Sequence, residues 1–118
     1  MSDSTLRLTT AQAIIKYLTN QFIMIDGEKT RICGGGFGIF GHGNVSCLGE
    51  ALYNAQDALP LYRGQNEQSM GFAAAGYAKY HLRRRFMFCT ASAGPGTANL
   101  LTSAGLAHAN RLPMLMLC

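Results

Sequence analysis

Short apolar segments alternate with longer helical segments along almost the whole of this sequence, and this alternation limits the folds that it can adopt. Apolar stretches suited to strands cover residues 34–40, 59–62, 86–90 and 113–118. The connections between them are too long for hairpins, whereas helical crossovers join neighbouring strands of a parallel sheet. Nearly continuous apolar strands are typical of a sheet that is buried on both faces. The sequence therefore predicts an α/β fold, with a parallel sheet of at least four strands and helices on both faces.

Four segments are predicted to be the helices, namely residues 11–22, 45–55, 67–80 and 97–110. In the first, apolar residues recur on one face as far as Phe22, behind a cap at Thr9 or Thr10. The third is capped by Asn66 and is built largely of glycine and alanine, so another element or a partner must approach it closely. Residues 26–29 are predicted to form a polar turn.

Composition favours one globular domain. A chain of 118 residues suits a single domain, and 48% hydrophobic residues with only 14% charged residues argue against disorder. We expect residues 1–8 to be a flexible tail and residues 9–118 to form the domain. Residues 114–118 resemble a buried strand without a following turn or cap, so the chain is interpreted as a fragment truncated at its C-terminus.

Several classes of function find no support in the sequence. The formal net charge of +4 comes largely from Arg83, Arg84 and Arg85, which are expected in a solvated turn and lack the features of a nucleic-acid site. The four cysteines form no CxxC pair and have no histidine at ligand spacing, so we expect reduced core residues and no metal site. No serine-nucleophile motif or histidine triad occurs. Without a long apolar run or a secretory signal, the protein is expected to be cytoplasmic, with no membrane partner.

The loops that follow the strands are where a ligand is expected, because parallel sheets bind ligands outside the carboxyl ends of their strands. These loops lie near residues 41–44, 63–67 and 91–96. Glu67 places a carboxylate at the start of the small-residue helix, where a ligand or a partner can come close. An acidic residue in a first helical turn can also simply complement the helix dipole. The position of Glu67 alone leaves both interpretations open.

The other two loops are rich in glycine. Gly94, Pro95 and Gly96 let the backbone approach a ligand at the start of a helix, although an ordinary strand-to-helix turn uses similar residues. His42 follows the first predicted strand, and its imidazole could serve a ligand as a donor or proton carrier. The glycine spacing there resembles a dinucleotide-binding motif only superficially, because no acidic partner or helix start fits that motif.

Two motifs taken together carry a family resemblance. Asn66-Glu67-Gln68 precedes a helix that contains Gly-Tyr-Ala, and residues 90–99 are Thr-Ala-Ser-Ala-Gly-Pro-Gly-Thr-Ala-Asn. In their order and spacing, the residues from about Leu8 to Cys118 resemble the N-terminal, pyrimidine-binding domain of the acetohydroxyacid synthase-like thiamine-diphosphate enzymes. That family typically has His-Glu-Gln at the first motif and Thr-Ser-Gly-Pro-Gly-Ala-Thr-Asn at the second.

The resemblance implies a role for each motif. Glu67 is expected to bond a pyrimidine ring nitrogen of thiamine diphosphate and so activate the cofactor as a nucleophile. Gly94, Pro95 and Gly96 are expected to bind the cofactor as well. Magnesium and the diphosphate are expected on a separate domain of another subunit, whose GDG…N motif does not occur in this chain. The resemblance thus implies a homo-oligomer with the cofactor at a subunit interface, and no activity for this fragment alone.

Departures from the family pattern concern the substrate side. Phe40-Gly41-His42-Gly43-Asn44 replaces the usual Pro-Gly-Gly turn, and Gln65-Asn66 replaces the pair before the glutamate. The combination resembles the branch of the family that cleaves a carbon–carbon bond of a cyclic polyol diketone with water, giving 5-deoxyglucuronate in myo-inositol degradation. His42 and Asn44 are then candidates for contacts with the polyol, although a purely structural loop also fits them.

Three other functions stay open at this point. A synthase or decarboxylase acting on 2-keto acids would use the same cofactor and the same domain. A non-catalytic domain could keep the fold only for dimerisation, and a nucleotide-binding module could use the glycine-rich loop. The first differs from the favoured function in its substrate, whereas the other two would not depend on Glu67.

Overall fold

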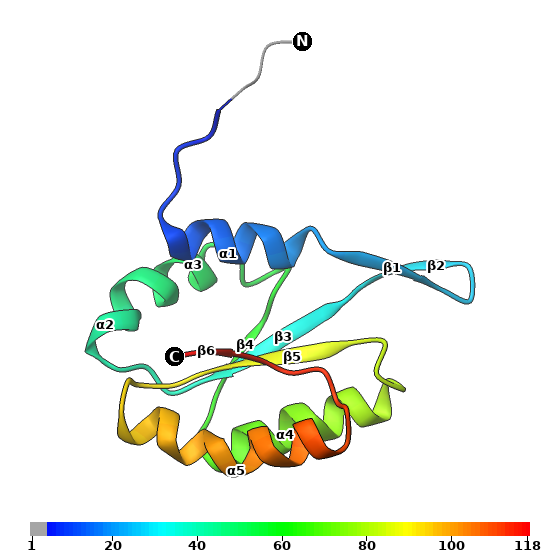
Figure 1. The fold of residues 1–118 in the computed structure, drawn as a ribbon. Helices are drawn as coiled ribbons and strands as arrows, with labels where there is room; N and C mark the ends of the chain where they lie inside the picture. Colours follow the sequence, from blue (N-terminus) through cyan, green and yellow to red (C-terminus); the bar gives the residue numbers. More distant parts are fainter. Residues whose placement is uncertain (1–4) are drawn as a thin grey trace.

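A four-stranded parallel sheet forms the centre of the computed structural model, which describes residues 5–118 (Figure 1). The strands lie in the order β4-β3-β5-β6 and comprise β3 (Cys33–Gly38), β4 (Leu61–Arg63), β5 (Phe86–Thr90) and β6 (Leu115–Leu117). Every neighbouring pair is parallel, so the predicted α/β sheet is confirmed. Of the predicted tail, residues 1–4 lie outside the described residues, and residues 5–8 are exposed and without regular structure.

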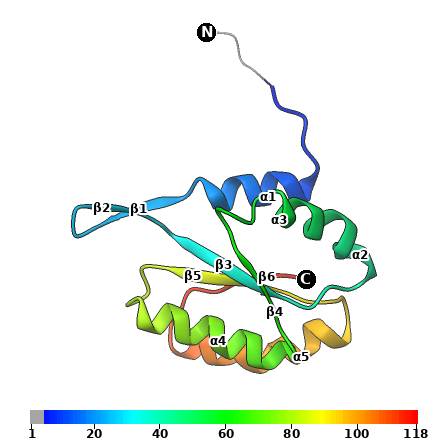
Figure 2. The same cartoon turned by 180° about the vertical axis from the view of Figure 1, so that it is seen from behind.

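Helices cover both faces of the sheet, as predicted (Figure 1, Figure 2). One face carries α1 (Thr10–Thr19) and a segment made of α2 (His42–Asn44), the π-helical turn η1 (Val45–Gly49) and α3 (Glu50–Tyr53). The other face carries α4 (Glu67–Tyr80) and α5 (Pro95–Ala109). Thr9 caps α1 in a reciprocal capping box with Gln12, and Asn66 caps α4. None of the helices within residues 5–118 combines the length and the apolar character needed to cross a membrane.

The segment after α1 is a hairpin, and the prediction that the first helix extends to Phe22 is wrong. The helix ends at Thr19, and the last predicted helical residue begins β1 (Phe22–Ile25), which pairs antiparallel with β2 (Glu28–Arg31). Figure 1 shows this hairpin projecting from the side of the sheet. Asp26 and Gly27 both have positive φ, as a tight hairpin turn requires. The Asp-Gly turn and the strand-favouring Phe-Ile-Met-Ile segment outweigh the helical spacing.

The small residues of α4 let α5 pack very close to it. Gly71, Ala74, Ala75 and Ala78 are buried. A methyl group at Gly71 would collide with the side chain of Ser103 on α5. The sequence predicted a close neighbour for this helix. At Gly71 that neighbour is α5 of the same chain.

We expect Gly71→Ala to destabilise the protein, because the added methyl group has no space beside Ser103, which is fully buried. Overpacking of this kind costs about 1–3 kcal/mol. Gly105→Ala is the control, since nothing lies within 4 Å of the added carbon. Alanine there should stabilise α5 by up to about 1 kcal/mol. Urea unfolding of the full-length protein measures both variants, and equal stabilities would contradict the packing explanation.

Two of the four cysteines are buried and two are exposed. Cys33 and Cys89 are buried free thiols, as expected for core residues, whereas Cys47 and Cys118 are exposed, so the prediction is wrong for those two. Cys47 lies in η1 directly before the buried Leu48 and points away from the core. Burial raises the pKa of Cys89 to about 12, which keeps its thiol protonated at neutral pH.

The arginine-rich turn after α4 is only partly solvated. Arg83 and Arg84 are exposed, as predicted. Arg85 instead donates a hydrogen bond to the carbonyl oxygen of Arg31 at 3.0 Å, and its guanidinium carbon lies 5.6 Å from the ring centroid of Tyr77. Two of the three arginines therefore fit the predicted solvated turn, and the third holds the start of β5 against its neighbours.

Candidate active site

Three segments that follow β3, β4 and β5 meet at the carboxyl edge of the sheet. They are the starts of α2 at His42, of α4 at Glu67 and of α5 at Pro95. Side chains connect them, because Asn44 reaches the end of β5 and Asn99 of α5 reaches Glu67 of α4. This arrangement follows from the parallel register, in which each strand ends at the same edge. Site residues predicted from separate parts of the sequence thus come together.

Glu67 is the first residue of α4, and its side chain is half-buried. Its Oε2 accepts a hydrogen bond from Asn99 Nδ2 at 2.9 Å. Its Oε1 faces Gly96, where a Cβ atom would lie 3.3 Å from this oxygen. Within residues 5–118 no other hydrogen bond from a side chain, and no salt bridge, reaches the carboxylate. One oxygen is held in place, and the other is left for a ligand.

The turn into α5 depends on glycine at both of its predicted positions. Gly94 has a φ of 78° and a ψ of −112°, a conformation that residues with a Cβ atom rarely adopt. Pro95 occupies the first helical position, where a backbone N–H is not needed. Gly96 is buried, and a Cβ atom there would lie 2.5 Å from Ser92 Oγ as well as against Glu67. Glycine at position 96 therefore keeps the space beside the carboxylate free.

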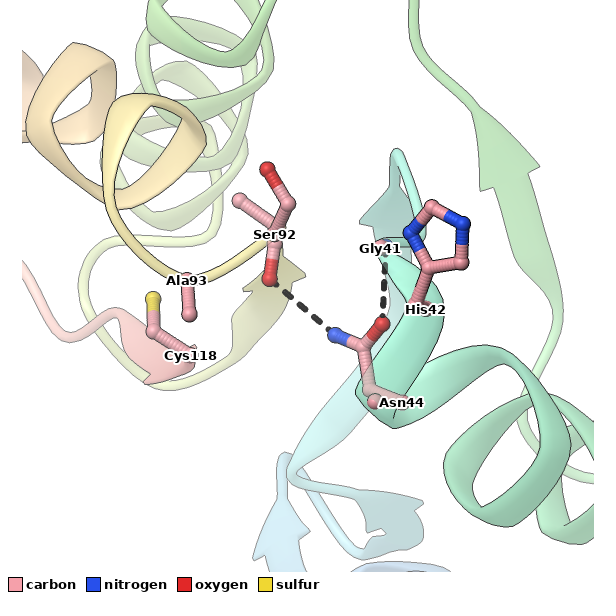
Figure 3. Close-up of a pocket in the computed structure, with 8 residues that line it drawn as sticks. Gly41, His42, Asn44, Ser92, Ala93 and Cys118 are labelled. Atoms are coloured by element: carbon pink, nitrogen blue, oxygen red, sulfur yellow. Dashed lines mark hydrogen bonds between the residues drawn. The ribbon is translucent and has the colours of Figure 1, made fainter.

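A pocket of about 510 Å³ lies between the α2 turn and the segment after β5 (Figure 3). His42 lines it, and its side chain is exposed. Within residues 5–118 no hydrogen bond engages the imidazole, so it is free to reach a ligand. Ser92 connects the pocket with the Glu67 region, because it lines the pocket while its hydroxyl borders Gly96.

Asn44 also lines the pocket, but its amide is already used within the protein. Its Nδ2 donates to Thr90 Oγ1 at 3.1 Å and to the carbonyl oxygen of Ala91 at 3.0 Å. Its Oδ1 accepts from the backbone N–H of Gly41 at 2.9 Å, and Figure 3 shows the amide held between the turn and the end of β5. The geometry favours a structural role for Asn44, in contrast to His42.

We expect Asn44→Ala to lower the free energy of unfolding by about 2 kcal/mol, because three polar groups lose their partner, two of them on the fully buried residues Thr90 and Ala91. Asn54→Ala is the matched control, since Asn54 is exposed at the end of α3 and no hydrogen bond within residues 5–118 involves its side chain. Thermal unfolding of the full-length protein compares the two. A shift no larger than that of the control would show that these bonds do not hold the turn.

Asn99 and Ser92 belong to the site but were not singled out from the sequence. Both lie in the glycine-rich motif of residues 90–99. Asn99 follows Gly96 by one helical turn, so the two residues face the same side of α5. A polar residue at that spacing from a glycine in the first helical turn is the signal that could have identified Asn99.

The sequence profile of one protein family matches residues 36–118. The family is described as the N-terminal TPP binding domain of thiamine pyrophosphate enzymes. The matched residues include the α2 turn, Glu67 and the turn into α5. The chain belongs to this family, as the resemblance of its motifs predicted.

Individual relatives indicate a narrower group than the family does, because they are named for one substrate. Over 117 residues, the chain is 52% identical to the 3D-(3,5/4)-trihydroxycyclohexane-1,2-dione hydrolase of Listeria monocytogenes serotype 4b (strain F2365), which aligns 99% of this chain with 18% of the relative. Identity to the protein of that name from Geobacillus thermodenitrificans (strain NG80-2) is 51% over 114 residues, covering 97% of this chain and 18% of the relative. A Bacillus thuringiensis (strain Al Hakam) hydrolase of the same name is 49% identical over 113 residues, covering 96% of this chain and 18% of the relative. The chain thus spans 18% of the length of these relatives.

The residues at this edge fit the ring end of thiamine diphosphate. A half-buried carboxylate with one oxygen held and the other free can share a proton with a ring nitrogen. Gly96 leaves beside it a space that a Cβ atom would fill. For the metal that accompanies a diphosphate, residues 5–118 contain no group of three or more His, Cys, Asp or Glu that could hold it.

Proposed function

We propose that residues 9–118 form the N-terminal, cofactor-activating domain of a thiamine-diphosphate-dependent hydrolase. The proposed reaction cleaves a carbon–carbon bond of 3D-(3,5/4)-trihydroxycyclohexane-1,2-dione to give 5-deoxyglucuronate in myo-inositol degradation. The observation that carries the proposal is identity of about half of the residues, over 96–99% of the chain, to hydrolases named for that substrate. The geometry around Glu67 supports it, because a free carboxylate oxygen beside a glycine suits a flat ring.

In the proposed mechanism, Glu67 is the group that shares a proton with the pyrimidine ring. Its Oε1 would bond a pyrimidine ring nitrogen and share a proton with it. Gly94, Pro95 and Gly96 would border the ring, with Gly96 leaving the space that the ring needs. When bound, thiamine diphosphate supplies a nucleophilic carbon that can add to a substrate carbonyl.

On the substrate side, the proposal places the α2 turn beside the polyol. His42 has a free imidazole, which can donate to one hydroxyl and accept from another. Asn44, the second candidate, is proposed to contribute by fixing this turn to β5, because its amide groups already have partners. Substitution of His42 is therefore expected to act on the KM for the substrate, and substitution of Asn44 on stability first.

The remaining parts of the proposed enzyme lie beyond this domain. Mg²⁺ and the diphosphate would be held by a separate diphosphate-binding domain, contributed by another subunit of a homo-oligomer. The domain alone would then lack activity. A small-molecule substrate and a cytoplasmic enzyme complete the proposal, with neither nucleic acid nor membrane as a partner.

The test uses the full-length protein with thiamine diphosphate and Mg²⁺, supplied either with the cyclic diketone or with pyruvate. We expect release of acid from the diketone, because hydrolytic ring opening produces a carboxylate, and no turnover of pyruvate. Turnover of pyruvate alone would identify a 2-keto acid synthase or decarboxylase instead. Failure to bind thiamine diphosphate, together with tight binding of NAD or FAD, would favour the nucleotide-binding alternative. Cofactor binding without any turnover would favour a non-catalytic domain.

A further inference from the structure

The first turns of α5 lie beside both oxygens of the Glu67 carboxylate. Gly96 faces Oε1, and Asn99, one helical turn later, donates to Oε2 at 2.9 Å. Glu67 starts α4, so this contact joins two helices through residues that are 32 positions apart. One helix thus provides a free space at one oxygen and a hydrogen-bond donor at the other.

Within the part of the chain that the structure describes, Asn99 is the side chain that holds this carboxylate. The salt bridge found within residues 5–118 joins Arg84 to Asp26 and does not involve Glu67. The neighbouring Asn66 turns its own side chain to Ser69 as a helix cap. Asparagine is also a poor residue for the interior of a helix, compared with alanine or leucine. The presence of asparagine inside α5 therefore indicates that its side chain has a specific partner, which here is Glu67.

A neutral donor suits this task better than a cation would. A lysine or arginine at position 99 would form an ion pair with Glu67 and compete with a ligand for its charge. The amide of Asn99 restricts the rotation of the carboxylate and leaves its charge to the ligand. Because the donor holds Oε2, the oxygen that remains available is the one beside Gly96.

We propose that Asn99 is a positioning residue for cofactor activation, which holds Glu67 so that Oε1 is presented to the pyrimidine ring. This inference rests on the proposed function and adds to it, because Asn99 acts only through Glu67. A carboxylate that is ordered before binding avoids the entropy cost of ordering it when the cofactor arrives. The expected effect therefore appears in cofactor affinity, which can be measured without turnover.

Calorimetric titration of thiamine diphosphate with Mg²⁺ into the full-length protein tests the proposal. Asn99→Ala should raise the Kd about five-fold to ten-fold, the range expected for losing the anchor of one flexible side chain. In a Glu67→Ala background the same substitution should change the Kd less than about two-fold, because its partner is already absent. Thr102→Ala, exposed on the same helix, is the control and should leave the Kd unchanged.

A second variant covers the case in which alanine disturbs the fold. Asn99→Asp keeps the shape of the side chain but sets a carboxylate against Glu67, so it should weaken binding more than Asn99→Ala does. An unchanged Kd for Asn99→Ala, or equal losses with and without Glu67, would overturn the inference and leave the proposed function intact. If the native protein does not bind the cofactor, the proposed function fails and the inference fails with it.

Discussion

Glu67→Gln in the full-length protein should reduce turnover of the cyclic diketone by about 100-fold to 1,000-fold, within the range for loss of a general acid–base group. Glutamine keeps the size of the side chain and can still accept the bond from Asn99. It cannot take up and return a proton at the position of Oε1. The measurement is kcat at saturating cofactor and substrate, so that weaker binding does not mimic a loss of chemistry.

Glu50→Gln is the matched control for this substitution. Glu50 is an exposed acidic residue inside the helical segment that runs from α2 through η1 into α3, and it does not line the pocket. Loss of a favourable interaction with the dipole of α4 costs about 0.3–1 kcal/mol at Glu67. A substitution at an exposed position such as Glu50 usually changes stability by no more than about 0.5 kcal/mol. Both variants should therefore unfold at similar temperatures, while only Glu67→Gln loses turnover. Unchanged turnover in both would mean that Glu67 only complements the dipole of α4.

Gly36→Ala should destabilise the fold strongly, with a loss of about 3 kcal/mol from overpacking. Gly36 of β3 lies opposite Phe88 of β5 in the sheet, and a Cβ atom there would collide with the Phe88 ring. The ring is 0% exposed and cannot move toward solvent. Such a loss is a large fraction of the roughly 5–15 kcal/mol that stabilises a typical domain. Urea unfolding of the full-length protein measures it.

Two comparisons separate this collision from a general effect of replacing glycine by alanine. Gly49→Ala is the control, because its added carbon would meet the Phe40 ring at 3.8 Å, an ordinary contact. Phe88→Ala alone should cost about 3–5 kcal/mol through the cavity that it leaves. In that background Gly36→Ala should cost much less, because the ring that it strikes is gone. Additive losses, or a double variant that fails to fold when Phe88→Ala alone folds, would contradict the collision.

Elements with strong local signals could be predicted from the sequence. The Asn66 cap and the small-residue segment located α4 at Glu67–Tyr80, and the apolar run located β5 at Phe86–Thr90, both as the structure has them. Caps and apolar runs act within a few residues, so they need no knowledge of the rest of the fold. Around Phe22 two local signals competed, and a hairpin formed where helical spacing also existed.

In the candidate site, too, some features could be predicted from the sequence and others depended on the packing of the whole chain. A place for Glu67 at the carboxyl edge follows from the predicted parallel sheet, and its proposed partner ring follows from the motif around it. The hydrogen bond from Asn99 to Glu67 and those from Asn44 to Thr90 and Ala91 could not be predicted, because each joins residues that are far apart in sequence. Those contacts depend on how closely α5 packs on α4 and how the α2 turn meets β5, which the packing of the whole chain decides.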